Sequence, residues 1–209
     1  MKFQYFAFKL LGICVILFTL QNIFPITESL ALVSKDVLAR PWILITSIFL
    51  HGSFNHLFYN MFALGLFGFI LEKIIGSKKF ITLFFSAGII ASLGAVPFYE
   101  AALGASGAIF GILGCLAVLR PRMRVYVGYV PMPMIVAAIV WAAGDLLGMF
   151  IPSGTANAAH LFGLAFGIMA GLYLRKKYGK ELFEKRNLPN ISEKQFKEWE
   201  DNWMYSKGQ

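Results

Sequence analysis

Long apolar runs separated by short basic stretches constrain the fold of this 209-residue chain more than any other feature. Hydrophobic residues make up 58% of the sequence and charged residues only 14%, whereas soluble domains have about 45–50% and about 25%. A membrane span needs about 20 apolar residues, so the chain has room for about six or seven spans and little else. The composition therefore predicts an all-α membrane protein that crosses the bilayer several times.

Six spans joined by short connections are predicted, in a bundle. They cover residues 5–24, 56–75, 80–96, 105–119, 125–150 and 156–174. The fourth span is marginal for a full crossing at ~1.5 Å rise per residue, so we expect it to begin below one membrane surface. Residues 42–50 are apolar but too short to cross, which favours a re-entrant or interfacial segment.

The distribution of basic residues predicts the orientation. Of the 19 Lys and Arg residues, only Lys35 and Arg40 lie on one side of the predicted spans, and all the others lie on the opposite side. The positive-inside rule then places both termini in the cytoplasm and predicts a multi-pass protein of the cell membrane. Because the basic clusters lie between apolar runs, topology explains the net charge of +8, and no nucleic-acid partner is expected.

Two domains are expected: a membrane domain over residues 1–178 and a polar cytoplasmic tail over 179–209. In the tail, residues 192–195 have the pattern of a helix capping box, and aromatic residues follow at helical spacing. This pattern predicts a short amphipathic helix on the inner membrane surface, with a docking site for a partner as the alternative. Cys14 and Cys115 lie in apolar runs without CxxC spacing, so we interpret them as packing residues, with no disulfide and no metal.

Polar side chains within the predicted spans are few, and ionisable ones are costly in lipid and typically functional. The polar residues within or beside the spans are His51, His56, Asn60, Ser106, Asp145, Asn157 and His160. The predicted orientation brings five of them to the extracellular half of the bilayer. These five are His51, His56, Asn60, Ser106 and His160. Asp145 is assigned to the inner part of the fifth span, away from them.

Small residues indicate that the fourth and sixth spans pack closely. Gly107 and Gly111 lie four residues apart on the fourth span, and Gly163 and Gly167 repeat this spacing on the sixth. Such stripes let helix backbones approach, as a direct hydrogen bond between side chains of the two spans requires. Gly104 precedes this stripe and leaves the start of the fourth span open.

The residue types predict acyl-transfer chemistry. A serine hydroxyl becomes nucleophilic when a base takes its proton, and neutral imidazole suits that task, so Ser106 pairs with His160. With Asp145 assigned elsewhere, we expect a dyad rather than a triad. His56 and Asn60 share one helix face, and with the backbone N–H of Ser106 they are candidate oxyanion donors, each worth on the order of 3 kcal/mol.

Three motifs carry a resemblance to a known family. The segments are His51-Gly-Ser-Phe-Asn-His56-Leu-Phe-Tyr-Asn60, Gly104-Ala-Ser106-Gly107 and Ala159-His160-Leu-Phe-Gly163. Together, over about residues 40–175, they resemble the rhomboid family of intramembrane serine proteases. The resemblance implies a six-span bundle, a first loop half-buried in the outer leaflet, and mobility around the fifth span for substrate entry.

The resemblance also implies roles for individual residues. Ser106 is then the nucleophile, His160 the general base, His56 and Asn60 the oxyanion and positioning groups, and His51 the support of that network. Two positions depart from the family pattern. Trp42 is followed by Ile43 where the family commonly has arginine, with Arg40 as a possible substitute. Phe110 stands where the family often has tyrosine, which keeps a ring to pack on His160 but removes the hydroxyl.

Other interpretations compete with this one. Taken singly, Ser106 is a packing residue, the histidines and Asn60 are interhelical hydrogen-bonding groups, and Asp145 is structural. A transporter would have broken helices at mid-membrane and repeats between halves, which are not evident. A zinc protease would need an HExxH-type motif, which is absent. The main alternative is a catalytically inactive relative that binds membrane-protein clients.

The sequence therefore predicts a serine endopeptidase that cleaves transmembrane segments through an acyl-enzyme. An intact helix hides its carbonyl groups in backbone hydrogen bonds, so we expect single-pass substrates with helix-destabilising residues near the cut. The predicted partners are such substrates and the lipid bilayer, and no cofactor is expected.

Overall fold

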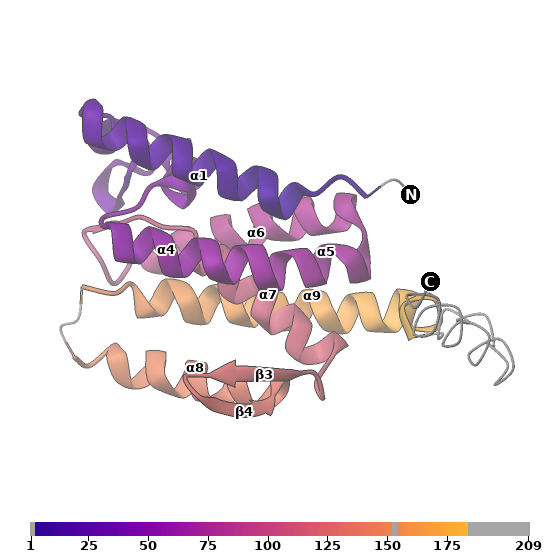
Figure 1. Cartoon of the computed structure of the whole chain (residues 1–209). Coiled ribbons are helices and arrows are strands. Elements are labelled where there is room, and N and C mark those ends of the chain that lie inside the picture. Colours follow the sequence, from indigo (N-terminus) through magenta and orange to yellow (C-terminus); the bar gives the residue numbers. More distant parts are fainter. Residues whose placement is uncertain (1–2, 152–153, 184–209) are drawn as a thin grey trace, which may run out of the picture. The chain divides into compact units, whose positions relative to one another are not determined.

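The computed structural model describes residues 3–151 and 154–183 (Figure 1). The chain forms two compact units, Met1–Lys177 and Tyr178–Gln209, and the predicted tail helix lies outside the described residues. The main helices of the first unit run side by side as a bundle (Figure 1). They are α1 (Phe6–Ile23), α4 (Phe54–Ala63), α5 (Phe69–Ile75), α6 (Ser77–Ala95), α7 (Ser106–Leu119), α8 (Met134–Gly148) and α9 (Asn157–Phe183).

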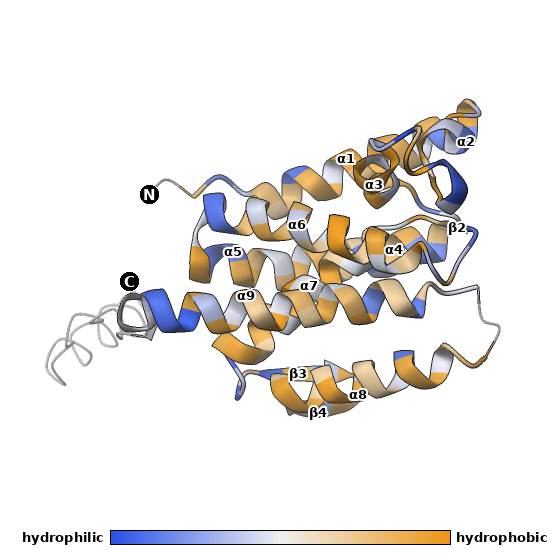
Figure 2. Ribbon diagram, turned by 180° about the vertical axis from the view of Figure 1, so that it is seen from behind, coloured by the Kyte–Doolittle hydropathy of each residue, from blue (hydrophilic) through white to orange (hydrophobic). Residues whose placement is uncertain are grey.

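Four helical segments are long and apolar enough to cross a membrane. They are Phe6–Ile23, Phe54–Ile75, Ser77–Ala95 and Asn157–Gly179. The second of these joins α4 to α5 through η3 (Leu64–Gly68), a π-helical stretch. The helices α7 and α8 are apolar but shorter, at 14 and 15 residues, so the count of six spans stays a prediction. Figure 2 shows the apolar helices and the hydrophilic turn between α5 and α6.

The connection from α7 to α8 is a β-hairpin, which the sequence analysis did not predict. Strands β3 (Arg124–Val127) and β4 (Val130–Pro133) pair antiparallel, with Arg124 opposite Pro133 and Val127 opposite Val130. Gly128 in the turn has a φ of +63°, which favours glycine. The predicted fifth span, 125–150, is therefore wrong at its start, because α8 begins only at Met134.

The segment between α1 and α4 folds as short pieces against the bundle. It contains α2 (Thr27–Leu30), β1 (Leu32–Val33), η1 (Ser34–Asp36), α3 (Ile43–Thr46) and η2 (Ser47–Phe49). Strand β1 pairs with β2 (Ala101–Ala102), directly before α7, with Leu32 opposite Ala102. Within this segment Arg40 donates to the Asp36 carboxylate at 2.5 Å and to the Glu28 carbonyl at 3.2 Å. This loop thus helps to fix the chain that leads into α7.

A buried glutamate joins the start of α1 to the turn between α5 and α6. The carboxylate of Glu72 accepts hydrogen bonds from the backbone N–H groups of Phe6 and Ala7, both at 3.0 Å. It also accepts one from the Ser77 hydroxyl at 2.6 Å. These bonds satisfy N–H groups that the first turn of a helix leaves without intrahelical partners.

Candidate active site

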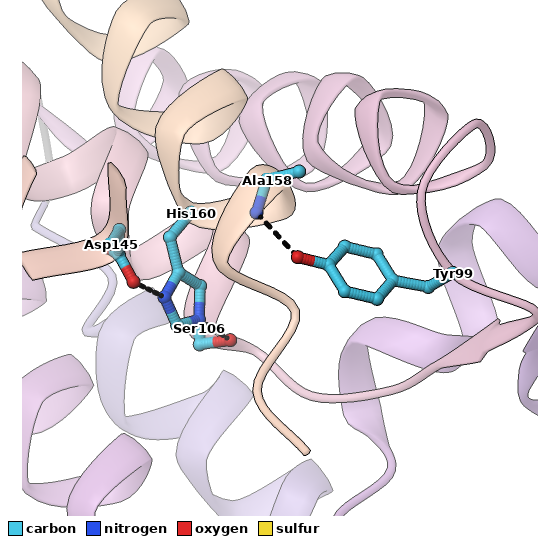
Figure 3. Close-up of polar contacts among 5 residues, drawn as sticks. All are labelled: Tyr99, Ser106, Asp145, Ala158 and His160. Carbon is cyan, nitrogen blue, oxygen red and sulfur yellow. Dashed lines mark hydrogen bonds and ion pairs between the residues drawn. The ribbon is translucent and has the colours of Figure 1, made fainter. Parts of the chain in front are cut away.

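Ser106 and His160 meet between two helices. Ser106 is the first residue of α7, and His160 lies about one turn into α9. The Ser106 Oγ atom lies 2.8 Å from the His160 Nε2 atom, and His160 is 9% exposed (Figure 3). A hydroxyl that donates to an unprotonated imidazole nitrogen has the arrangement of a nucleophile and its base.

Facing glycines make this contact possible. A Cβ atom added to Gly163 would lie 2.1 Å from the carbonyl oxygen of Gly107, and one on Gly167 would lie 1.9 Å from that of Gly111. Real Cβ atoms do not approach backbone so closely, so any side chain at these positions would push α9 away from α7. The two backbones are therefore near enough for a direct bond between Ser106 and His160.

The opposite side of α7 is packed as tightly. Added Cβ atoms on Gly107 and Gly111 would each lie 2.4 Å from an alanine Cβ of α6, on Ala91 and Ala87 respectively. The helix that starts with Ser106 is thus held between α6 and α9, and most of its residues are buried. Such packing fixes the position of the hydroxyl relative to the imidazole.

Asp145 lies against His160, which corrects the sequence-based assignment. Its Oδ1 atom is 2.9 Å from the His160 Nδ1 atom, and the side chain is 8% exposed (Figure 3). Asp145 lies near the end of α8 that leads to α9, and not in the inner part of the span. The predicted span, 125–150, also has Asp145 near this outer end, so the assignment to the inner part was wrong. The His160 ring therefore lies between Ser106 on its Nε2 side and Asp145 on its Nδ1 side, where only the pair of Ser106 and His160 was expected.

An aromatic ring fixes the plane of the imidazole. Phe110 lies one helical turn after Ser106, and its ring stacks on His160 with centroids 4.3 Å apart and an interplanar angle of 8°. Stacked rings of this kind restrict rotation of the imidazole and shield one face of it. The sequence analysis expected the Phe110 ring to pack on His160, and the structure places it there.

The start of α7 presents backbone donors beside Ser106. Among the described residues, no side chain caps this helix start, and the first bond of the turn runs from the Ile109 N–H to the Ala105 carbonyl at 3.0 Å. Earlier N–H groups of a helix have no intrahelical partner, and they lie at the positive end of the dipole. They suit an oxyanion that develops next to Ser106.

His56 and Asn60 come to the same cavity from α4. The Asn60 amide donates to the His56 carbonyl at 2.8 Å, and the Gly52 N–H donates to His56 Nδ1 at 3.5 Å. Gly104 has a φ of +125°, and an added Cβ atom there would lie 2.7 Å from the His56 ring. A glycine is therefore needed where the chain passes the imidazole on its way to Ser106.

His51 lies behind His56 rather than in the cavity. It is only 2% exposed, and its ring centroid is 5.0 Å from that of His56. Burial and the nearby His56 together lower the pKa of His51 to about 4, against the opposing effect of a backbone contact with Phe49. A neutral His51 packed against His56 can hold that ring in place, and it does not line the cavity that the described residues form.

Tyr99 is a contributor that the sequence analysis missed. Its hydroxyl accepts a hydrogen bond from the Ala158 backbone N–H at 3.1 Å, two residues before His160 (Figure 3). The contact joins residues 59 positions apart, so no local sequence pattern could have indicated it.

These residues surround an open cavity of about 1060 Å³. Its lining includes His56, Asn60, Tyr99, Ser106 and His160, together with Gly148 at the end of α8 and residues 149–151 after it. The cavity is large enough for a short stretch of polypeptide beside the hydroxyl. Among the described residues, no three His, Cys, Asp or Glu side chains are arranged as a metal site.

Comparison with known proteins identifies the family. The sequence profile of the Rhomboid domain matches residues 38–177, which is most of the chain. This protein belongs to the rhomboid family. It is a multi-pass membrane protein of that family, and the family match supports an intramembrane protease type of function.

Named relatives agree with the family match. Rhomboid protein 1, mitochondrial, of Saccharomyces cerevisiae is 32% identical over 192 residues, which cover 84% of this chain and 55% of that protein. YdcA of Bacillus subtilis, provisionally named a rhomboid protease, is 35% identical over 140 residues, 65% of this chain and 69% of its own length. Rhomboid protease GluP of the same organism is 35% identical over 148 residues, 68% of this chain and 28% of its own length.

Proposed function

We propose that this rhomboid protein is a serine endopeptidase that hydrolyses peptide bonds in transmembrane segments of other membrane proteins. The observation that carries the proposal is the 2.8 Å contact between Ser106 Oγ and His160 Nε2 at the wall of an open cavity. The names of the relatives YdcA and GluP support a protease, and the serine at the start of α7 supports the serine type.

Each residue has a defined part in the proposed reaction. Ser106 Oγ attacks the scissile carbonyl carbon while its proton passes to His160 Nε2. The resulting oxyanion accepts hydrogen bonds from N–H groups at the start of α7, with His56 and Asn60 as further donors. His160 then gives the proton to the leaving amine, which releases one product and leaves an acyl-enzyme. Water attacks this ester with His160 again as base and restores Ser106.

The proposed substrates are single-pass membrane proteins whose helix unwinds near the cut. A helical peptide bond has its carbonyl engaged by the N–H four residues later, so Ser106 cannot reach it until that turn opens. Segments with Gly near the cut open more cheaply than continuous leucine runs, because glycine has a low helix propensity. The small side chain of Ala leaves the backbone carbonyl more accessible to Ser106 than a leucine side chain does. Equal cleavage of a Gly/Ala-containing span and a continuous Leu-rich span in the same vesicles would contradict this preference.

The proposed location is the cell membrane, with both termini in the cytoplasm and the cavity open to the outside. The support is the basic residues at the ends of helices opposite the cavity, such as Lys73, Lys78 and Lys79 at the α5–α6 turn. The yeast relative is named as mitochondrial, so fractionation of expressing cells is the appropriate measurement.

The decisive experiment is labelling of the purified protein with a fluorophosphonate probe, together with cleavage of a single-pass substrate in vesicles. Ser106→Ala and His160→Ala should each abolish labelling and cleavage, because one removes the nucleophile and the other its base. Ser92→Ala is the matched control, since Ser92 is a buried helical serine that bonds to the Leu44 carbonyl at 3.2 Å. Equal labelling of the wild type, Ser106→Ala and His160→Ala would refute the mechanism.

Two further measurements separate this proposal from its alternatives. An inactive client-binding protein would capture the substrate without labelling or cleaving it. A metal-dependent enzyme would lose cleavage in the presence of a chelator, whereas the serine mechanism predicts an unchanged rate.

A further inference from the structure

We propose that Asp145 is the positioning residue of His160, so that the site works as a three-residue relay rather than as a serine–histidine pair. The inference deepens the proposed function and rests on it. Asp145 Oδ1 lies 2.9 Å from His160 Nδ1, on the side of the ring opposite the 2.8 Å contact between Nε2 and Ser106. The imidazole therefore has one polar partner on each nitrogen.

The surroundings of Asp145 indicate that its role is to hydrogen-bond His160. The carboxylate is 8% exposed, and within the described part of the chain its one hydrogen bond is to His160, while its Oδ2 atom has no partner. Removing a carboxylate from water is costly unless a partner compensates for it. Within the described residues, the Asp145 side chain hydrogen-bonds only to the proposed general base. The Glu72 carboxylate, by contrast, bonds to backbone N–H groups of another helix.

The contact determines which nitrogen of His160 carries its proton. A carboxylate oxygen can only accept a hydrogen bond, so the Nδ1 atom of His160 must donate. A neutral ring protonated on Nδ1 leaves Nε2 with a free lone pair, which is the form that can take the Ser106 proton. Asp145 thus selects the reactive tautomer and favours the imidazolium that forms during attack.

Asp145 acts through His160 and not on the substrate. The end of α8 lines the cavity with Gly148 and the residues after it, but Asp145 is not among the lining residues that the structure describes. The carboxylate lies behind the ring, while Ser106 and His160 face the cavity. Its loss should therefore slow the chemical step and leave substrate binding nearly unchanged.

The position of Asp145 also ties the site to α8. The buried residues of this helix are Met134, Ala137 and Ala138 near its start and Asp145 near its end. Among the described residues, the bond to His160 is thus a polar contact between the second half of α8 and α9. Any movement of α8 that separates the two helices also removes the relay.

The first test compares steady-state cleavage by the wild type, Asp145→Asn and Asp145→Ala in vesicles. We expect kcat to fall by about 100-fold or more in both variants, since the ring loses the partner that fixes its tautomer, while KM changes less than about twofold. Leu146→Ala is the matched control, because Leu146 is the next residue on α8 and its side chain is exposed. Unchanged kcat in both Asp145 variants would overturn the inference.

The second test reads the proton on His160 directly and does not depend on activity. The chain contains three histidines, so [¹⁵N]histidine labelling in detergent micelles gives three ring systems, and His160→Gln identifies the relevant one. We expect the proton on Nδ1 in the wild type and on Nε2 in Asp145→Ala at neutral pH. A wild-type ring protonated on Nε2, or the same tautomer in both proteins, would contradict the proposal.

The two levels of the hypothesis fail in different ways. If Ser106→Ala and His160→Ala abolish cleavage while the Asp145 variants cleave at the wild-type rate, the relay is wrong and the proposed function stands. If Ser106→Ala still cleaves, the proposed function itself is wrong. Because the wild-type tautomer is measured on the unmodified protein, an Asp145 variant that fails to fold does not remove the test.

Discussion

Phe110 lies flat on His160, with ring centroids 4.3 Å apart and the ring planes within 8° of parallel. Replacing Phe110 with leucine keeps the apolar volume but removes the stacked ring, so the imidazole gains rotational freedom. Aromatic pairs are worth about 0.5–1.5 kcal/mol beyond their buried area, which corresponds to a loss of roughly two- to tenfold in kcat. Phe110→Tyr keeps the ring and should retain most of the activity, and a greater loss in Phe110→Tyr than in Phe110→Leu would contradict the stacking role.

Tyr99 should matter for the start of α9. The Tyr99→Phe variant loses the acceptor for the Ala158 N–H, and leaving a partly buried donor without a partner costs about 1–2 kcal/mol. We expect a lower midpoint of thermal unfolding in detergent and a reduced cleavage rate, since His160 follows two residues later. Tyr126→Phe is the control, because Tyr126 is exposed on the hairpin. Equal effects of the two substitutions would remove the special role of Tyr99.

The long apolar runs allowed several elements to be predicted from the sequence alone. The predicted runs 80–96 and 156–174 correspond to Ser77–Ala95 and to the first part of Asn157–Phe183. The fourth run was expected to start at residue 105, and α7 begins at Ser106. These successes share a cause: helices packed in a bundle and facing lipid need unbroken apolar sequence, which is visible without any long-range information.

The hairpin between α7 and α8 could not be predicted in this way. Residues 125–133 contain no charged residue, so hydropathy alone extends the span across them. The available signals were Gly128 and the two prolines, Pro131 and Pro133, which fit a turn and an edge strand better than a helix interior. With the hairpin in place, α8 begins at Met134 and has 15 residues, and Asp145 lies near the end that leads to α9. The predicted span also had Asp145 near that end, so its assignment to the inner part was a separate error.

The site depends on close helix packing at glycines and on hydrogen bonds between distant residues, and only the first leaves a pattern in the sequence. The glycine spacing at Gly107, Gly111, Gly163 and Gly167 is periodic, and it indicated in advance which helices approach each other. The bond from Ala158 to Tyr99 and the bond between His160 and Asp145 join residues on different elements with no shared motif. Such pairs emerge only when the fold is assembled.

Gly163 is predicted to be among the positions most sensitive to substitution. In Gly163→Ala the new Cβ atom would lie 2.1 Å from the Gly107 carbonyl oxygen, so α9 must move away and His160 moves with it. Misplacement of a reacting group by about 1 Å can cost about 100-fold in rate, and the overpacking itself costs about 1–3 kcal/mol.

Gly144→Ala provides the matched control for this prediction. Gly144 lies within α8, and an added Cβ atom there meets nothing within 4 Å. The substitution should leave cleavage unchanged and gain up to about 1 kcal/mol from helix propensity. Similar losses of kcat in Gly163→Ala and Gly144→Ala would show that the close approach of α7 and α9 is not what matters.

The buried His51 predicts how stability depends on pH. Its pKa is lowered from 6.5 to about 4 in the folded protein, so between these values the unfolded chain binds a proton that the folded chain does not. The free energy of unfolding should therefore be highest above about pH 6.5 and should fall as the pH is lowered towards 4. The full contribution of this group is about 3 kcal/mol.

Removing the titrating ring should flatten this profile. We expect His51→Asn to lower stability at pH 7.5, because the packing against His56 is lost, but to reduce the additional fall between pH 6.5 and pH 4.5. The measurement is the midpoint of thermal unfolding in detergent across this pH range. Glu28→Gln is the control, since Glu28 is exposed and its removal should leave the slope unchanged. If His51→Asn and the wild type lose stability in parallel as the pH falls, another group is responsible and His51 does not carry the pH dependence.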